Sequence, residues 1–164
     1  MATPTYDLLD STTLASAASS VTFTGIDQSY GDLVLVAESK NTGTGAYMTM
    51  KLNNDTGSNY NQIFADGNGS SAQSISYSNQ SIAYLQGVDP MSNTDSNLTV
   101  LQFLDYSATN KHKSILHRDN RANALVYMQA IRYASNSALT TIEIAVNSNS
   151  FASGSTFYLY GIAK

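Results

Sequence analysis

Turn-forming residues interrupt this chain about every ten residues, and that spacing constrains its fold more than any other feature. The interruptions are rich in Gly, Asn, Asp and Ser, as in residues 41–45 (NTGTG), 53–58 (NNDTGS) and 66–71 (DGNGSS). These residue types favour turns because they tolerate unusual backbone angles or bond to nearby backbone groups. Many short segments separated by such turns are typical of a β-sandwich or a β-barrel.

The segments between the turns show the alternation of a half-buried strand. Val21 and Phe23 alternate with Thr22 and Thr24, which places the apolar side chains on one face. The same reasoning predicts strands at residues 32–38, 46–52, 60–64, 98–106, 111–117, 124–133, 141–146 and 155–162, and one interrupted or two short strands within 73–85. Turns are expected at 119–123 and a long loop at 87–97.

Residues 33–36 (LVLV) form an uninterrupted apolar run, which suits a strand buried on both faces. No segment shows a convincing helical period, no fixed-length repeat occurs, and the composition does not change along the chain. We therefore predict an all-β fold: a single-domain, jelly-roll-like antiparallel β-sandwich of about ten short strands. It is expected to span residues 1–164, with residues 1–20 forming an extended arm or an edge strand.

The surface is expected to be polar but nearly uncharged. Only 12% of the residues are charged, 42% are hydrophobic, and the formal net charge is -4. Because the chain has few cationic residues, a surface that neutralises phosphates is not expected, and neither is a nucleic-acid partner.

The N-terminus shows no basic region before an apolar run, and no apolar stretch approaches the roughly 18 residues of a membrane span. The absence of cysteine excludes a disulfide scaffold and a cysteine-based zinc site.

No group of residues points to catalysis or to a cofactor. His112 and His117 lie five residues apart on a predicted strand, so their side chains face opposite ways and form no metal pair there. Residues 117–119 spell the HRD of a protein kinase loop without any other kinase motif, and no GxSxG serine motif occurs. Asp55 and Asp66 lie in predicted turns that lack the further carboxylates of a calcium loop. We therefore expect no catalytic, cofactor-binding or metal-binding residues.

Tyrosines are the side chains best suited to contact a ligand. The chain has 11 of them and no tryptophan, and five lie on predicted strands: Tyr47, Tyr127, Tyr133, Tyr158 and Tyr160. A tyrosine offers a flat apolar face and a hydroxyl, which together suit stacking against a sugar. Tyrosines on strands also serve in sandwich cores and subunit interfaces, which is the more common role. These five are therefore candidate glycan or interface contacts.

Several stretches, taken in order along the chain, resemble the small structural proteins of tailed bacteriophages. The stretch LNNDTGSNY at residues 52–60 is similar to the LNGDxGxNY of that family, and the end of the chain is similar to its closing pattern, I-x-I, then F, then GSTFxLYGI. The residues that carry the resemblance are 11–26, 30–36, 52–60, 140–144, Phe151 and 154–162. Residues 70–123 depart most from the family pattern.

The resemblance implies a virion protein without catalytic residues. We expect a non-enzymatic surface accessory or decoration protein, made in the bacterial host cytoplasm and attached to the capsid through protein–protein contacts. Its expected partners are the major capsid protein or tail components and further copies of the same chain, with a homotrimer as the family-level expectation. The alternative is a tail-fibre or receptor-binding subunit whose β-sandwich binds a host surface glycan. A hydrolase of surface polysaccharide is the third hypothesis, and it would depend on one Asp or Glu.

Leu35 lies at the centre of the predicted doubly buried strand and tests where that strand lies. We predict that Leu35→Ala lowers the free energy of unfolding by about 2–5 kcal/mol, because it removes buried apolar volume and leaves a cavity. Thermal or denaturant unfolding followed by circular dichroism measures this loss. An unchanged melting curve would show that the predicted position of this strand is wrong.

Overall fold

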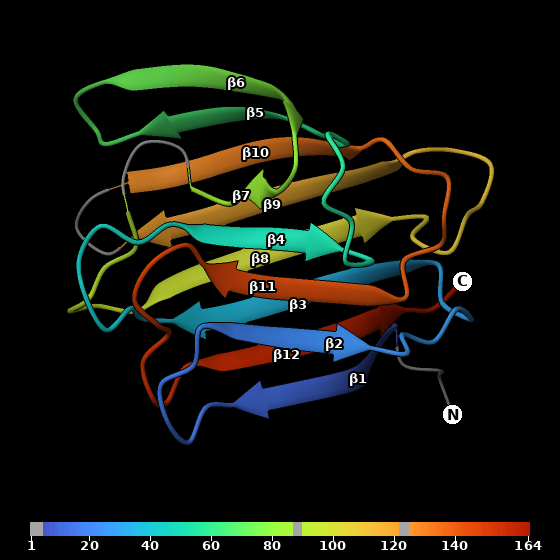
Figure 1. Cartoon of the computed structure of the whole chain (residues 1–164), viewed down its shortest axis with the longest axis horizontal. Coiled ribbons are helices and arrows are strands. Elements are labelled where there is room, and N and C mark those ends of the chain that lie inside the picture. The colour runs from blue at the N-terminus through green and yellow to red at the C-terminus, as the bar shows by residue number, and fades with distance from the viewer. Residues whose placement is uncertain (1–4, 87–89, 122–124) are drawn as a thin grey trace.

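The computed structural model describes residues 5–86, 90–121 and 125–164, and every regular element in these ranges is a β-strand (Figure 1). The strands are β1 (Tyr6–Thr13), β2 (Ser20–Thr24), β3 (Asp32–Ser39), β4 (Met48–Leu52), β5 (Tyr60–Gly67), β6 (Ala72–Gln80), β7 (Ala83–Tyr84), β8 (Asn97–Leu104), β9 (Lys113–Arg121), β10 (Leu125–Tyr133), β11 (Thr141–Val146) and β12 (Thr156–Ile162).

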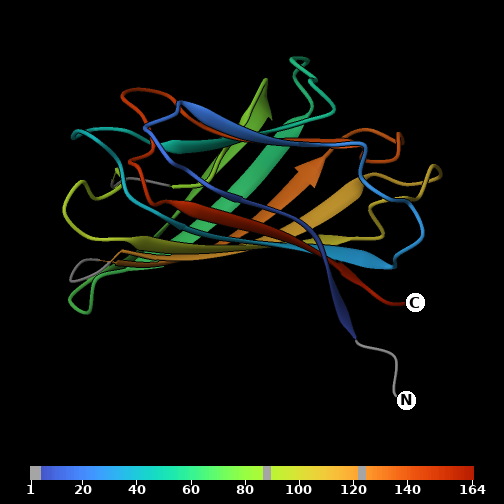
Figure 2. The same ribbon diagram turned by 90° about the horizontal axis from the view of Figure 1, so that it is seen from below.

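The strands form two antiparallel sheets that stack face to face (Figure 2). The large sheet has eight strands in the order β1-β12-β3-β8-β9-β10-β5-β6, and the small sheet has four in the order β2-β11-β4-β7. This arrangement confirms the predicted all-β, jelly-roll type of sandwich. The described residues contain twelve strands rather than about ten, since the N-terminal segment forms edge strand β1 and residues 73–85 contain both β6 and β7.

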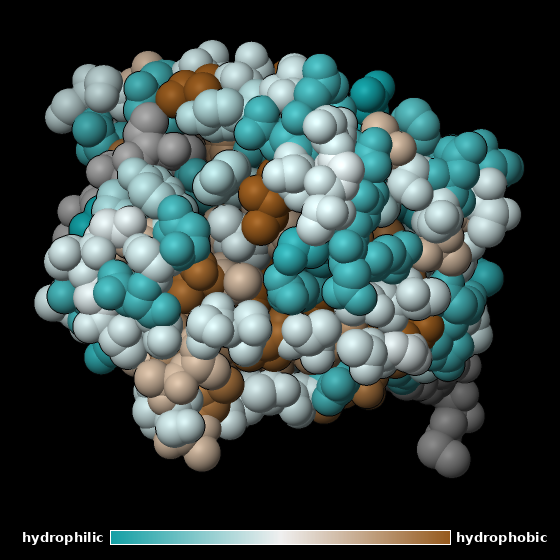
Figure 3. All heavy atoms as spheres, in the orientation of Figure 1, coloured by the Kyte–Doolittle hydropathy of each residue, from teal (hydrophilic) through white to brown (hydrophobic). Residues whose placement is uncertain are grey.

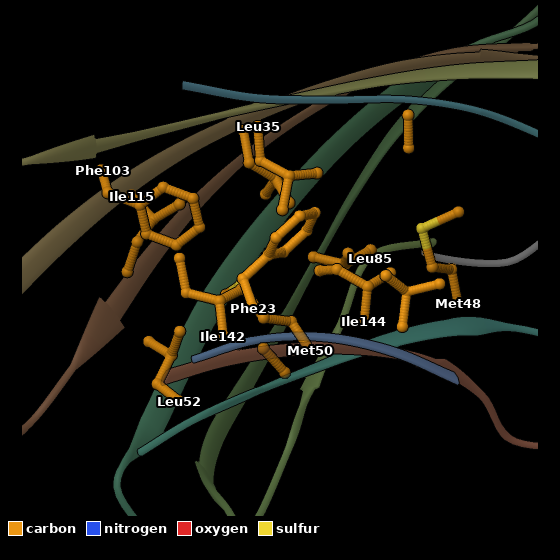
Figure 4. Packing of buried hydrophobic residues seen from close by; sticks show 14 of the residues in the cluster. Phe23, Leu35, Met48, Met50, Leu52, Leu85, Phe103, Ile115, Ile142 and Ile144 are labelled. Atoms are coloured by element: carbon orange, nitrogen blue, oxygen red, sulfur yellow. The ribbon is translucent and has the colours of Figure 1, made fainter. Parts of the chain in front are cut away.

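The core lies between the sheets and is built from alternate residues of nearly every strand. Leu35 of β3, Phe103 of β8 and Ile144 of β11 are fully buried and pack in one cluster (Figure 4). The prediction that β3 is buried on both faces holds only for its inner face. Val34 and Val36, on the opposite face, remain partly exposed because no strand of the small sheet covers them.

Glutamine side chains join the two sheets at the β7 edge. Strand β7 pairs with β4 on one side only. On the other side, the Tyr84 N–H donates to Gln62 Oε1 at 3.2 Å, and Gln129 Nε2 donates to the Tyr84 carbonyl at 2.8 Å. Both glutamines come from the large sheet, so their amides take the place of a neighbouring strand. The Tyr84 N–H and carbonyl, which would otherwise be left without partners at this edge, are thereby hydrogen-bonded.

The stretch 52–60 is a structural turn. Asn53 and Asn54 both adopt positive φ, a backbone region that asparagine tolerates better than most residues. The Asp55 carboxylate accepts hydrogen bonds from the Gly57 N–H at 2.7 Å and from the Tyr133 hydroxyl at 2.8 Å. These bonds hold the pKa of Asp55 below its ordinary value, the Gly57 contact having the largest effect. The carboxylate therefore fixes the turn to the end of β10.

The closing stretch also has a structural explanation. Gly154 adopts a φ of +86°, a conformation that is strained for other residues, in the turn before β12. Gly161 lies under the ring of Tyr30, and a Cβ at this position would come within 2.5 Å of a ring carbon. Both glycines of the closing stretch 154–162 are thus required, Gly154 by backbone geometry and Gly161 by close packing.

Two expectations about turns need correction. Asp119 belongs to β9 and is buried, because the strand continues to Arg121; residues 122 and 123 of the predicted turn lie outside the described residues. Asp66 belongs to β5 rather than to a loop, and its side chain is also buried. The predicted loop at 87–97 includes residues 87–89, which likewise lie outside the described ranges.

Candidate functional site

The outer face of the large sheet carries two rows of mainly apolar side chains that run across its strands. One row follows the cross-strand register from β1 to β5 through Leu8, Tyr160, Val34, Gln102, Leu116, Ala130 and Ile63. The next row runs from β12 to β5 through Tyr158, Val36, Val100, Arg118, Met128 and Ala65. Apolar side chains on an outer sheet face are a departure from the usual polar pattern.

This face forms a groove with a volume of about 600 Å³. Tyr6 of β1 and Ile63 of β5 both line it, although five strands separate these two in the sheet order. The large sheet must therefore curve around the groove. Its floor includes Leu116 and Met128, whose exposed fractions of 51% and 66% are high for apolar side chains.

The opposite side of the molecule has a different character. Figure 3 shows polar residues over most of the small-sheet side, with apolar residues in scattered spots. Among the residues exposed on β2 are Ser20, Thr22 and Thr24. Contiguous exposed apolar surface of the kind found in the groove marks an interaction site more often than single exposed residues do.

Arg118 places a positive charge in the middle of the groove. It is exposed, and among the described residues its guanidinium makes no ion pair or hydrogen bond. Its cross-strand neighbours in the row are Val100 and Met128, which offer it no acceptor. A guanidinium in apolar surroundings has five donors for a carboxylate or carbonyl. The groove therefore favours an occupant that is apolar and carries at least one negative or strongly accepting group.

The five predicted tyrosine contacts do not come together. Tyr158 and Tyr160 lie on the groove side of β12, partly exposed, with their rings stacked 6.4 Å apart. Tyr47 precedes β4 of the small sheet and is partly exposed there. The prediction is wrong for Tyr127 and Tyr133, which are buried at 1% and 2% exposure because their positions in β10 point inward.

Sequence reasoning missed the groove residues Ile63, Leu116 and Met128. The signal that could have found them is the presence of apolar residues at both alternating positions of one strand. Residues 124–133 (ALVYMQAIRY) show this pattern. One set of positions fills the core, and the other must then lie on the opposite face of the sheet.

A second cluster of polar side chains lies inside the sandwich, beneath the groove. Gln129 Nε2 donates to Gln62 Oε1 at 3.2 Å. The Oε1 atom of Gln129 accepts a hydrogen bond from His117 Nδ1 at 2.8 Å. His117 is therefore the Nδ1–H tautomer when neutral. On the same face of β9, Asp119 Oδ2 accepts from Gln86 Nε2 at 3.2 Å.

Burial shifts both titratable groups of this cluster toward their uncharged forms. Desolvation lowers the pKa of His117 to about 4, against a smaller opposing effect of the Gln129 hydrogen bond. Desolvation also raises the pKa of Asp119 to about 7, and the hydrogen bond from Gln86 offsets only part of that shift. His112, by contrast, is exposed; it lies just before β9, which begins at Lys113, and not on the strand as predicted.

The described ranges contain no group of three or more His, Asp or Glu side chains placed to hold a metal ion. In residues 5–86, 90–121 and 125–164 there is also no helix long and apolar enough to cross a membrane.

Comparisons with known proteins bear on the fold alone. No family model matches the chain, and no curated protein matches it. Among solved structures, it is similar to a galectin, LEC-6 of Caenorhabditis elegans, with 10% identity, a TM-score of 0.36, and coverage of 100% of this chain and 99% of that one. It is also similar to the alginate lyase Aly36B in complex with an alginate tetrasaccharide, with 8% identity, a TM-score of 0.40, and coverage of 94% and 79%. A homodimeric agglutinin from chicken liver, CG-16, has 10% identity and a TM-score of 0.29, with coverage of 81% and 99%.

The inner cluster predicts opposing pH effects that single substitutions separate. The native chain keeps Asp119 protonated up to about pH 7, whereas the unfolded chain releases that proton near its ordinary pKa of 3.8, so this group makes stability fall as pH rises across that window. His117 stays neutral down to about pH 4 in the native chain but binds a proton below its ordinary pKa of 6.5 when unfolded, so this group makes stability rise with pH.

We expect the two effects to offset each other in the unchanged protein. Relative to it, Asp119→Asn should gain stability as pH rises between about 3.8 and 7, because the carboxyl effect is removed. His117→Gln should lose stability relative to the unchanged protein as pH rises between about 4 and 6.5, because the histidine effect is removed. Urea unfolding at a series of pH values measures both slopes. Parallel curves for the three proteins would contradict the assigned protonation states.

Proposed function

We propose that this chain is a non-enzymatic structural protein of a tailed-phage virion, a surface accessory or decoration protein held to the capsid by protein–protein contacts. The observation that carries the proposal is the apolar groove across the large sheet, with Leu116 and Met128 exposed on its floor. A protein whose described residues leave this much apolar surface uncovered is suited to being covered by a partner.

The residues behind the phage-protein resemblance support a structural role. Asp55 and Asn53 hold a turn, Gly154 supplies a backbone angle, and Gly161 accommodates the ring of Tyr30. Each of these roles concerns folding rather than chemistry on a substrate. The resemblance therefore fits a family that shares an architecture without sharing a catalytic centre.

The chemistry of the groove indicates what the partner presents. A concave face is filled by a convex one, so the expected occupant is an apolar segment of another virion protein that projects into the groove. That segment carries a carboxylate for Arg118, which is the one charged residue on the two central rows. A buried, paired guanidinium is worth far more to affinity than one at a wet rim.

Groove substitutions test this proposal on particles. The chain should be found by mass spectrometry in purified virions of the phage that encodes it, and purified chain should co-sediment with particles from which it has been deleted. We expect Leu116→Glu and Arg118→Glu each to weaken that binding at least about tenfold, equivalent to ~1.4 kcal/mol, by burying an unpaired carboxylate in the interface. Both side chains are exposed, so folding should be little changed.

The matched control is Ser20→Glu, which adds the same charge at an exposed position on the small sheet. It should bind particles as the unchanged chain does. Equal binding by all four proteins would exclude the groove as the attachment surface. Absence of the chain from purified virions would reject the structural role itself.

A second candidate function rests on the stacked pair Tyr158 and Tyr160 at the side of the groove. Together with Gln102, they offer aromatic faces and an amide, which are elements of a glycan-binding site. In this alternative the chain is a tail-fibre or receptor-binding subunit. Binding to host surface glycans on an array, lost in Tyr160→Ala and kept in Tyr47→Ala, would favour it over the decoration role. No binding to any host glycan would reject it.

A further inference from the structure

The large sheet ends in two edge strands that differ in how well they resist pairing with another chain. β1 carries Asp7 and Asp10 and has a register shift between Leu8 and Asp10. Charges and bulges of this kind discourage a further strand from adding to an edge. β6 is nine residues long, AQSISYSNQ, with no charged residue and no proline. It also has a register shift against β5, but this falls at its C-terminal end, where Asn79 has a φ of +55°, and residues 72–77 pair in continuous register. Among the described residues, β6 pairs only with β5.

We propose that β6 is a dimerisation edge, which pairs antiparallel with β6 of a second copy about a two-fold axis at Ser76. The occupant follows from the sequence of the strand itself. With Ser76 on the axis, Ile75 lies opposite the partner's Tyr77, and Ser74 lies opposite the partner's Ser78.

This self-complementary order places hydroxyls opposite hydroxyls and apolar side chains opposite apolar ones. Ser76 meets its own counterpart, Ser74 meets the partner's Ser78, and a β-branched side chain meets an aromatic one. Aromatic and β-branched pairs and hydroxyl pairs are among the cross-strand contacts that stabilise antiparallel sheets. A strand that must match itself at an isologous contact requires this symmetry, whereas an ordinary edge strand does not.

The side chains of β6 are already divided between the two faces in a way that fits the pairing. Ile75 lies opposite Phe64 of β5, so Ile75 and Tyr77 are on the inner side of the sheet. The Tyr77 ring contacts Phe64 edge to face at 5.6 Å, yet Tyr77 remains 37% exposed. The partner's Ile75 would cover that exposed side. Ser74 and Ser76 lie on the groove side, opposite Ala65 and Ile63.

Charge pairs at position 76 test the two-fold axis. Ser76 is exposed, so Ser76→Lys should leave the melting curve of the chain nearly unchanged. In the dimer the two lysines would face each other directly, and like charges directly opposite destabilise strand pairing. Analytical ultracentrifugation should show a dimer for the unchanged protein and at least a tenfold higher dissociation constant for the variant.

A mixture of Ser76→Lys and Ser76→Glu should restore the dimer as a heterodimer, since residue 76 meets its own counterpart only at a two-fold axis. The matched control is Ser11→Lys, at an exposed position on the other edge strand, which should leave the dimer intact. Dissociation by Ser11→Lys but not by Ser76→Lys would overturn the proposal. A protein that is monomeric at high concentration, or a trimer insensitive to Ser76→Lys, would also overturn it.

A disulfide variant gives an independent readout, because the chain has no cysteine of its own. Residues opposite each other in an antiparallel pair lie about 4.5–5.5 Å apart at Cα, within the range that a disulfide spans. Ser76→Cys should therefore oxidise to a covalent dimer at concentrations where Ser11→Cys stays monomeric. Equal cross-linking of the two variants would indicate random collision and count against the edge contact.

Discussion

The central strands of the large sheet carry apolar side chains on both faces, and the rest of the structure depends on how those two faces are covered. The small sheet has half as many strands and can cover one face only. Inner residues such as Leu35 are consequently fully buried, while Met128, at an outward position of β10, remains 66% exposed. Covering apolar surface is worth about 25 cal/mol per Å². Covering this face with another molecule would therefore be favourable, and this makes the groove, rather than any titratable group, the candidate site.

Covering the inner face with so small a sheet creates a problem at its edge, and polar side chains solve it. β7 is only two residues long and has no further strand beside it, so the amides of Gln62 and Gln129 satisfy the backbone of Tyr84. Gln129 also accepts a hydrogen bond from the buried His117, and Gln86 donates one to the buried Asp119. Because burial disfavours charge on both, His117 stays neutral above about pH 4 and Asp119 stays protonated below about pH 7. The two proton equilibria therefore change the stability of the fold in opposite directions.

The periodicity of the sequence was enough to predict the fold class and most strand positions, because each alternating segment has only one way to bury its apolar side chains. It was not enough to assign Tyr127 and Tyr133, since a tyrosine suits a core and a surface equally and only the register of β10 decides between them. Asp119 was expected in a turn because aspartate is common there, but pairing with β8 and β10 extended β9 past it. The groove escaped prediction for a further reason: it is made of residues from strands far apart in sequence, and only the strand order of the sheet brings Leu116, Val34 and Ile63 into one row.

The edge and the groove belong to the same sheet, and this links the two proposals without making either depend on the other. Pairing along β6 would join two eight-stranded sheets into one, with Ser74 and Ser76 of each copy between the two apolar faces. Both copies of Arg118 would then lie on the same side of one continuous sheet. Two grooves held in fixed relation bind a repetitive surface, such as a lattice of identical subunits, more tightly than either alone, because the second contact forms at a high effective concentration. A modest affinity per groove would then be sufficient, which agrees with two central rows that are mainly apolar and carry a single charge, Arg118.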